Sequence, residues 1–177
     1  GMILIPNLML EEKTTRTLDA LLVSPANSLQ IAIGKALAGL FYTFIFILIA
    51  FLLNYSFVIQ WWLAILTTFL WAIVCIALGL LLGTLIENRQ QLIVVANIIM
   101  FPLFLPIFLS IMTDLLPSWL ISVFQWLPPV ATSVLLRISF SDQAVPNEII
   151  PRLALLFIVM VGLLFWEAFV LKRSDRK

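Results

Sequence analysis

The chain has 177 residues, of which 63% are hydrophobic and 11% are charged, with a formal net charge of +1 and a mean hydropathy of +1.17. Soluble domains are nearer half apolar and a quarter charged, so this composition predicts an integral membrane protein. The sequence has no histidine and one cysteine, Cys75, which excludes histidine triads, histidine zinc sites and a disulfide framework within one chain. No basic run indicates a nucleic-acid partner, and we expect no cofactor.

The chain opens with a short apolar stretch, residues 3–10, after Gly1 and Met2, which resemble a cloning remnant. The stretch is too short to span a bilayer, which takes about 20 residues. It also lacks the basic flank of a signal peptide. We expect it to be the cytoplasmic end of a helix whose beginning is missing.

A polar segment, residues 11–28 (EEKTTRTLDALLVSPANS), separates this stretch from the first complete span. Its charged residues are Glu11, Glu12, Lys13, Arg16 and Asp19. Leu18, Leu21 and Leu22 are spaced i, i+3, i+4, which predicts one apolar face on a short helix. The helix must end near Pro25, because the residue before a proline disfavours the helical region. The alternative is a solvated loop whose leucines rest on the membrane surface.

Four later runs are long and apolar enough to cross a bilayer as helices. We expect them at about residues 36–53, 63–86, 92–111 and 153–171. The second run contains Gly79 and Gly83 in a GxxxG pattern, which serves either packing inside one bundle or a dimer interface. The third contains Pro102 and Pro106, which should kink or break its helix.

Between the last two runs, residues 115–139 are apolar but interrupted by Pro117, Pro128 and Pro129. They are too broken for a straight span and too apolar for a water-exposed loop. We expect two short helices that dip into the membrane from the outer side and return, buried against protein. The alternative is an interfacial amphipathic helix with a tryptophan anchor. A polar loop is expected at residues 141–151.

Glu167 lies near the end of the last span. An acid inside a span is a functional candidate by default. Lys172 and Arg173 of the basic tail are only about one turn away along the helix. We therefore expect an ordinary ion pair between Glu167 and one of these two residues.

The basic residues also predict the orientation of the chain, because cytoplasmic loops carry an excess of Lys and Arg. With residues 11–28 and the tail at 172–177 in the cytoplasm, eight of the ten basic residues lie inside. Only Arg137 and Arg152 lie outside. The opposite orientation would reverse this split.

Residues in and just after the polar segment resemble a motif of ABC-2 type transporter permeases, the membrane subunits of bacterial ABC exporters. The matching residues are Glu11-Glu12-Lys13, Thr17-Leu18-Asp19-Ala20-Leu21-Leu22, Ser24-Pro25 and Gly34-Lys35. They are similar to the family's segment EKE-x-GTLE-x-LL-x-TP and to the GK that follows it. Arg16 stands where the family usually has glycine, Asp19 where it often has glutamate, and Thr14 where the motif has a third charge.

The resemblance implies six spans with this motif between the second and the third. The stretch at 3–10 would then be the end of the second span, and the first span would be absent. It implies that residues 11–28 are a coupling helix that docks on a separate cytoplasmic ATP-binding subunit. The partner-binding residues would be Glu11, Glu12, Lys13, Thr17, Leu18, Asp19, Leu21 and Leu22. It further implies that two permeases, identical or different, form the export path in the inner (plasma) membrane, among lipids, for a substrate such as a drug, lipid or polysaccharide.

The expected fold is therefore a single all-α transmembrane domain over residues 1–177, with four full spans, an N-terminal partial span and a re-entrant helical stretch. Gly34-Lys35 is not a phosphate-binding loop, because Leu29 precedes it by five residues and Ala36 follows it. The chain is thus predicted to be no enzyme. The alternatives are an ion-coupled secondary transporter or channel, which needs ionisable groups at mid-membrane, and a membrane enzyme, which needs paired catalytic groups that we do not find.

Overall fold

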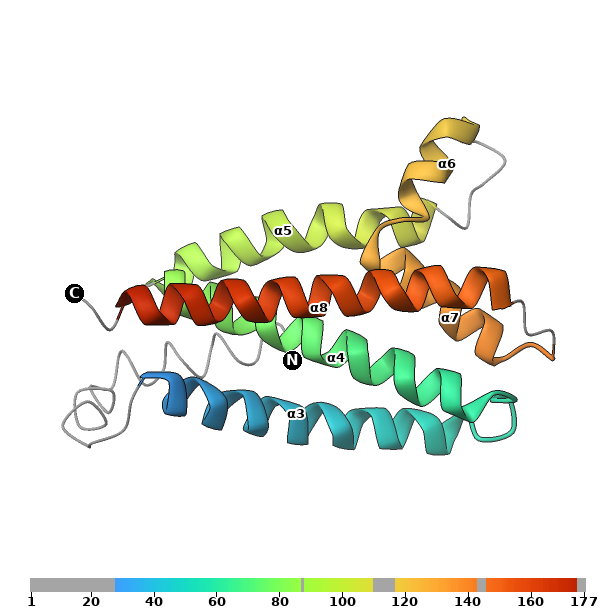
Figure 1. Cartoon of the computed structure of the whole chain (residues 1–177), viewed down its shortest axis with the longest axis horizontal. Coiled ribbons are helices and arrows are strands. Elements are labelled where there is room, and N and C mark those ends of the chain that lie inside the picture. The colour runs from blue at the N-terminus through green and yellow to red at the C-terminus, as the bar shows by residue number, and fades with distance from the viewer. Residues whose placement is uncertain (1–27, 87, 110–116, 143–145, 175–177) are drawn as a thin grey trace. The chain divides into compact units, whose positions relative to one another are not determined.

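The computed structural model describes residues 28–86, 88–109, 117–142 and 146–174 (Figure 1). Within these ranges every regular element is a helix: α3 (Ser28–Leu53), α4 (Trp61–Leu85), α5 (Arg89–Leu109), α6 (Ser118–Phe124), α7 (Pro128–Ser139) and α8 (Pro146–Ser174). In this part of the chain, α3, α4, α5 and α8 are long and apolar enough to cross a membrane. The expected all-α polytopic fold with four complete spans is confirmed. The expected N-terminal partial span lies outside the described residues.

α8 begins earlier than expected, which corrects the polar loop predicted for residues 141–151. Pro146 is its first residue, where a fixed φ favours helix entry, and Glu148 lies in its first turn, where the helix dipole favours an acid. The Arg152 guanidinium donates to the Glu148 carboxylate at 2.9 Å, one turn along. The predicted loop ended at Pro151, whereas the helix begins at Pro146 and continues through Pro151.

α5 passes through Pro102 and Pro106 as one continuous helix, so of the expected kink or break, the break does not occur. Each proline removes one backbone N–H and thereby frees one carbonyl, that of Ile98 or of Pro102. Both prolines lie in the second half of the helix, and the hydrogen bonds of the other residues keep it helical.

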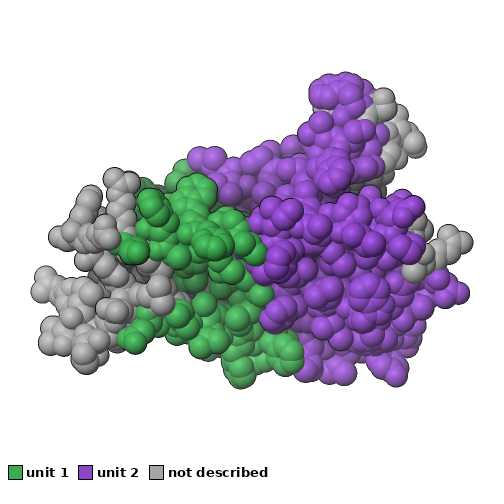
Figure 2. All heavy atoms as spheres, in the orientation of Figure 1, with its two compact units in different colours: residues 1–46, 72–96, 161–177 green, residues 47–71, 97–160 purple. Residues whose placement is uncertain are grey.

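The chain divides into two compact units (Figure 2). Unit 1 comprises Gly1–Phe46, Ala72–Ala96 and Val161–Lys177, and unit 2 comprises Ile47–Trp71 and Asn97–Met160. Each of the four long helices contributes one segment to each unit. One end of every span therefore belongs to unit 1 and the other end to unit 2.

The core of unit 2 is built by α4, α7 and α8. Leu63 of α4, Leu135 of α7 and Leu156 of α8 are fully buried there, and they cluster with Leu70 and Ile149. α7 is therefore a packed part of this unit.

Hydrogen bonds also fix the end of α7 within unit 2. The backbone N–H groups of Ile59 and Gln60, just before α4, both donate to the carbonyl of Ser139, at 3.0 and 2.9 Å. The Gln60 side chain donates to the carbonyl of Ser141 at 3.3 Å. Free N–H groups at a helix start and free carbonyls at a helix end need such partners. The start of α4 and the end of α7 thus satisfy each other.

The stretch at 115–139 contains two short helices, as the sequence predicts. α6 ends before Gln125, and Leu127, with φ −77° and ψ 133°, is the extended residue that precedes α7. Pro128 occupies the first position of α7, where its missing N–H costs no helical bond. Entry of these helices into the membrane stays a prediction.

α4 is the most buried of the four long helices. Of its span, 56% is buried inside the chain, against 6% for α3, 17% for α5 and 11% for α8. Gly79 and Gly83 are both buried, so this pair packs inside the chain. The other three spans present mainly apolar side chains outward, which is the surface that lipid or a second membrane chain covers.

Candidate functional site

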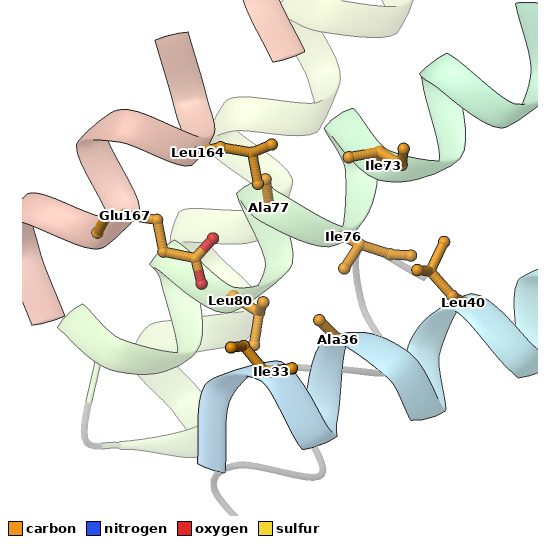
Figure 3. Close-up of a pocket in the computed structure, with 10 residues that line it drawn as sticks. Ile33, Ala36, Leu40, Ile73, Ile76, Ala77, Leu80, Leu164 and Glu167 are labelled. Atoms are coloured by element: carbon orange, nitrogen blue, oxygen red, sulfur yellow. The ribbon is translucent and has the colours of Figure 1, made fainter. Parts of the chain in front are cut away.

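Unit 1 holds an apolar cavity of about 320 Å³ between faces of three helices (Figure 3). α3 contributes Ile33, Ala36 and Leu40, α4 contributes Ile73, Ile76, Ala77 and Leu80, and α8 contributes Leu164, Glu167 and Ala168. Spacings of three, four and seven residues put each set on one face of its helix. Nine of these ten residues are apolar, and Glu167 is the exception.

The contact between α3 and α4 forms one side of this cavity. Ile76 and Leu80 of α4 are buried, and Ala36 and Leu40 of α3 pack against them. Because these four residues also line the cavity, the position of α3 determines its width on this side.

Glu167 lies on the cavity face of α8. Its side chain is only 6% exposed, and its carboxylate points into the cavity near Leu80 (Figure 3). Among the described residues, this carboxylate has neither a hydrogen bond nor an ion pair. Among the described residues that line the cavity, Glu167 is therefore the sole one with a polar side chain.

The predicted ion pair of Glu167 with Lys172 is wrong. Five residues on a helix correspond to a rotation of about 140°. Lys172 is exposed, whereas Glu167 is directed inward. The side chain of Arg173, the other predicted partner, lies outside the described residues.

The predicted partner-binding residues also lie outside the described part of the chain. They are Glu11, Glu12, Lys13, Thr17, Leu18, Asp19, Leu21 and Leu22. Of the wider motif, Gly34 and Lys35 fall in the first turns of α3. The Nζ atom of Lys35 is buried, but Lys35 does not line the cavity.

Sequence reasoning missed the cavity. One signal was present: Leu164, Glu167 and Ala168 form an i, i+3, i+4 set, which places the acid on an apolar face of the last span. The facing stripes on α3 and α4 carry no such signal, because almost every position of those helices is apolar.

A second, smaller hollow of about 160 Å³ lies in unit 2. It is lined by Gln125, Trp126, Asn147, Glu148, Pro151 and Arg152. Its acid and its base already form the ion pair at 2.9 Å, so their charges satisfy each other. Among the described residues, no group of three His, Cys, Asp or Glu side chains is placed to hold a metal ion.

The chain matches a known family over nearly its whole length. The matching family model is described as "ABC-2 family transporter protein" and covers residues 1–170. This range includes the polar segment, the four spans and all residues that line the cavity. No curated protein and no solved structure matches the chain.

Proposed function

The chain belongs to the ABC-2 transporter family, and from this premise we propose that residues 11–28 couple it to ATP hydrolysis in a separate subunit. Family membership makes the chain the multi-pass membrane permease of an ABC transporter, which works with an ATP-binding subunit. Beyond that, the proposal is that the permease exports its substrate, and that two permeases, identical or different, together form the path through the inner membrane.

The position of α3 carries this proposal. The helix begins at Ser28, the last residue of the polar segment, and it is the least buried of the four spans. Its Ala36 and Leu40 pack against Ile76 and Leu80 of α4 at the cavity. A partner that displaces residues 11–28 would therefore move a helix that forms a cavity wall, because α3 follows this segment directly in the chain.

The leucine face of the coupling segment is the proposed contact with the ATP-binding subunit. Burying one leucine side chain stabilises a contact by roughly 1.5–3 kcal/mol. Leu18→Asp or Leu21→Asp should remove at least that much, which is roughly ten- to hundredfold in affinity. Charged residues at the rim of such a contact contribute little, since exposed ion pairs are typically worth under about 1 kcal/mol.

The test is co-purification of the permease carrying Leu18→Asp plus Leu21→Asp with the ATPase encoded beside it, with substrate-stimulated ATP hydrolysis measured in parallel. Ala20→Asp, compared with each single leucine variant, is the matched control, because it adds one negative charge to the opposite face of the predicted helix. We expect normal membrane insertion, with association and stimulation lost in the leucine variant and kept in the control. Undiminished association in the leucine variant would mean that these leucines rest on lipid, as in the surface-loop alternative.

We also propose that unit 1 contains the cytoplasmic ends of the spans. The polar segment, the turn at Arg89 and the basic tail all adjoin helix ends assigned to this unit, and the excess of basic residues supports their cytoplasmic placement. In this orientation α6 and α7 dip from the outer side and return. Reporter fusions after Ile111 and after Ser141 should then both report the exterior, and opposite locations would show that the stretch crosses the membrane.

A further inference from the structure

We propose that the cavity of unit 1 binds an amphiphilic amine, with its hydrocarbon part against the apolar walls and its ammonium group against the carboxylate of Glu167. The inference deepens the proposed function, because such a molecule would be bound by the permease itself. It does not depend on the coupling segment, since binding requires no ATP.

The buried carboxyl group of Glu167 is the first argument. A charge inside an apolar environment is costly unless a partner compensates it. Glu167 is 6% exposed, points into the cavity and has no partner among the described residues. A cationic donor in the cavity would make a charge-assisted hydrogen bond, which is about twice as strong as a neutral one.

The volume and lining of the cavity are the second argument. About 320 Å³ falls in the range of small-molecule sites, which are mostly apolar with a few polar groups that fix orientation. Here one carboxylate lies among nine apolar residues. The combination selects a ligand with one cationic end and an apolar body, and it disfavours anions and strongly polar molecules.

Glu167 lies where such a ligand can enter. It is three residues before Val170, the end of the membrane span in α8. At about 1.5 Å per residue, the carboxylate is roughly 5 Å from that end along the helix axis. An amphiphilic amine at the membrane surface keeps its charge at the same depth, so it can approach Glu167 without first burying that charge alone.

The experiment compares three ligands of similar shape, 4-phenylbutylamine, 4-phenylbutanol and 4-phenylbutanoate. Binding to the permease in phosphatidylcholine nanodiscs is measured by saturation-transfer NMR titration, with empty nanodiscs subtracted and no nucleotide present. The variants are Glu167→Gln, which keeps the shape and removes the charge, and Ala36→Leu, which fills the cavity and keeps the carboxylate. Glu148→Gln is the matched control, because it makes the same change on the same helix in the exposed ion pair with Arg152.

We expect saturable binding of the amine to the wild type and to Glu148→Gln. Binding to Glu167→Gln should be roughly ten- to hundredfold weaker, equivalent to about 1.4–2.8 kcal/mol. Ala36→Leu should weaken amine binding as well, and the alcohol should bind wild type and Glu167→Gln alike. Equal amine binding by Glu167→Gln, or equal binding of the carboxylate ligand by the wild type, would overturn the proposal.

Adding phosphatidylethanolamine to the nanodiscs separates two sources of the amine. Competition by this lipid would support the site and identify a membrane lipid as its occupant, whereas the absence of competition would support a free amphiphile. If the coupling-segment variants kept their association with the ATPase, the coupling proposal would be wrong, but the amine-binding result would be unchanged. The two proposals can therefore fail separately.

Discussion

Leu135→Ala tests whether α7 is a packed part of the membrane domain. Leu135 is fully buried in unit 2, in the cluster with Leu63 and Leu156. Leu52→Ala is the matched control, because it makes the same substitution at a side chain on α3 that is 66% exposed.

The expected loss of stability depends on whether water or hydrocarbon surrounds the side chain in the unfolded state. In water-soluble cores, Leu→Ala costs about 2.7–5.0 kcal/mol, a sum of lost transfer free energy and a residual cavity. The three carbon groups that Leu→Ala removes account for roughly 2.4 kcal/mol of free energy of transfer from water. When unfolded helices stay in lipid or detergent this transfer part vanishes, since hydrocarbon surrounds the side chain in both states. Lost packing remains, and we expect Leu135→Ala to cost about 0.5–2.5 kcal/mol.

The assay is a titration from dodecylmaltoside into SDS, in which helices separate but remain in an apolar phase. Cys75, the single cysteine of the sequence, is half-buried in α4 and reports unfolding through a thiol-reactive dye. Leu135→Ala should shift the midpoint to lower SDS, and Leu52→Ala should shift it little. Equal small shifts would refute the reasoning, because they would mean that α7 lies on the membrane surface and adds nothing to the packed unit.

Two further predictions concern the orientation of the chain in the membrane and the exposed face of α8. In a Cys75→Ala background, an impermeant thiol reagent applied to intact cells should label Asp142→Cys but neither Ser28→Cys nor Ser174→Cys; labelling of either of the last two would invert the proposed orientation. Gly162→Ala should be neutral or should stabilise α8 by up to about 1 kcal/mol in the SDS titration, because an added Cβ meets nothing within 4 Å and alanine favours a helix. A loss of permease assembly in this variant would show that a second chain packs on this face.

Hydrophobicity was sufficient to predict the four spans. Runs such as residues 36–53 and 63–86 have no alternative to a helix, because backbone groups in lipid must be satisfied within the segment. The structure places α3 and α4 over these runs with small changes at their ends. α5 likewise stays one continuous helix across Pro102 and Pro106, because the hydrogen bonds of the neighbouring residues keep the chain helical.

The cavity could not be predicted in the same way, because its walls consist of the residues that every span contains. Which face of a nearly all-apolar helix turns inward depends on packing between helices, and the sequence pattern is almost uniform around α4. Glu167 was the one polar residue that the sequence pointed to, and its pairing with Lys172 was predicted wrongly because distance along the chain was considered without direction around the helix.

The location of Glu167 also links the two proposals physically. α8 brings the carboxylate to one side of the cavity, while α3, which follows the coupling segment, supplies the opposite wall through Ala36 and Leu40. A ligand held at Glu167 would contact both helices, so its affinity must depend on the position of α3. Any partner that moves α3 by binding residues 11–28 then changes the affinity of the cavity for its ligand. By thermodynamic linkage, the ligand changes the affinity of the permease for that partner by the same factor. The measurable consequence is that the amine changes the association of the permease with the ATP-binding subunit. This effect of the amine should be lost in Glu167→Gln and kept in Glu148→Gln. Equal association with and without amine would mean that the cavity and the coupling segment are energetically independent.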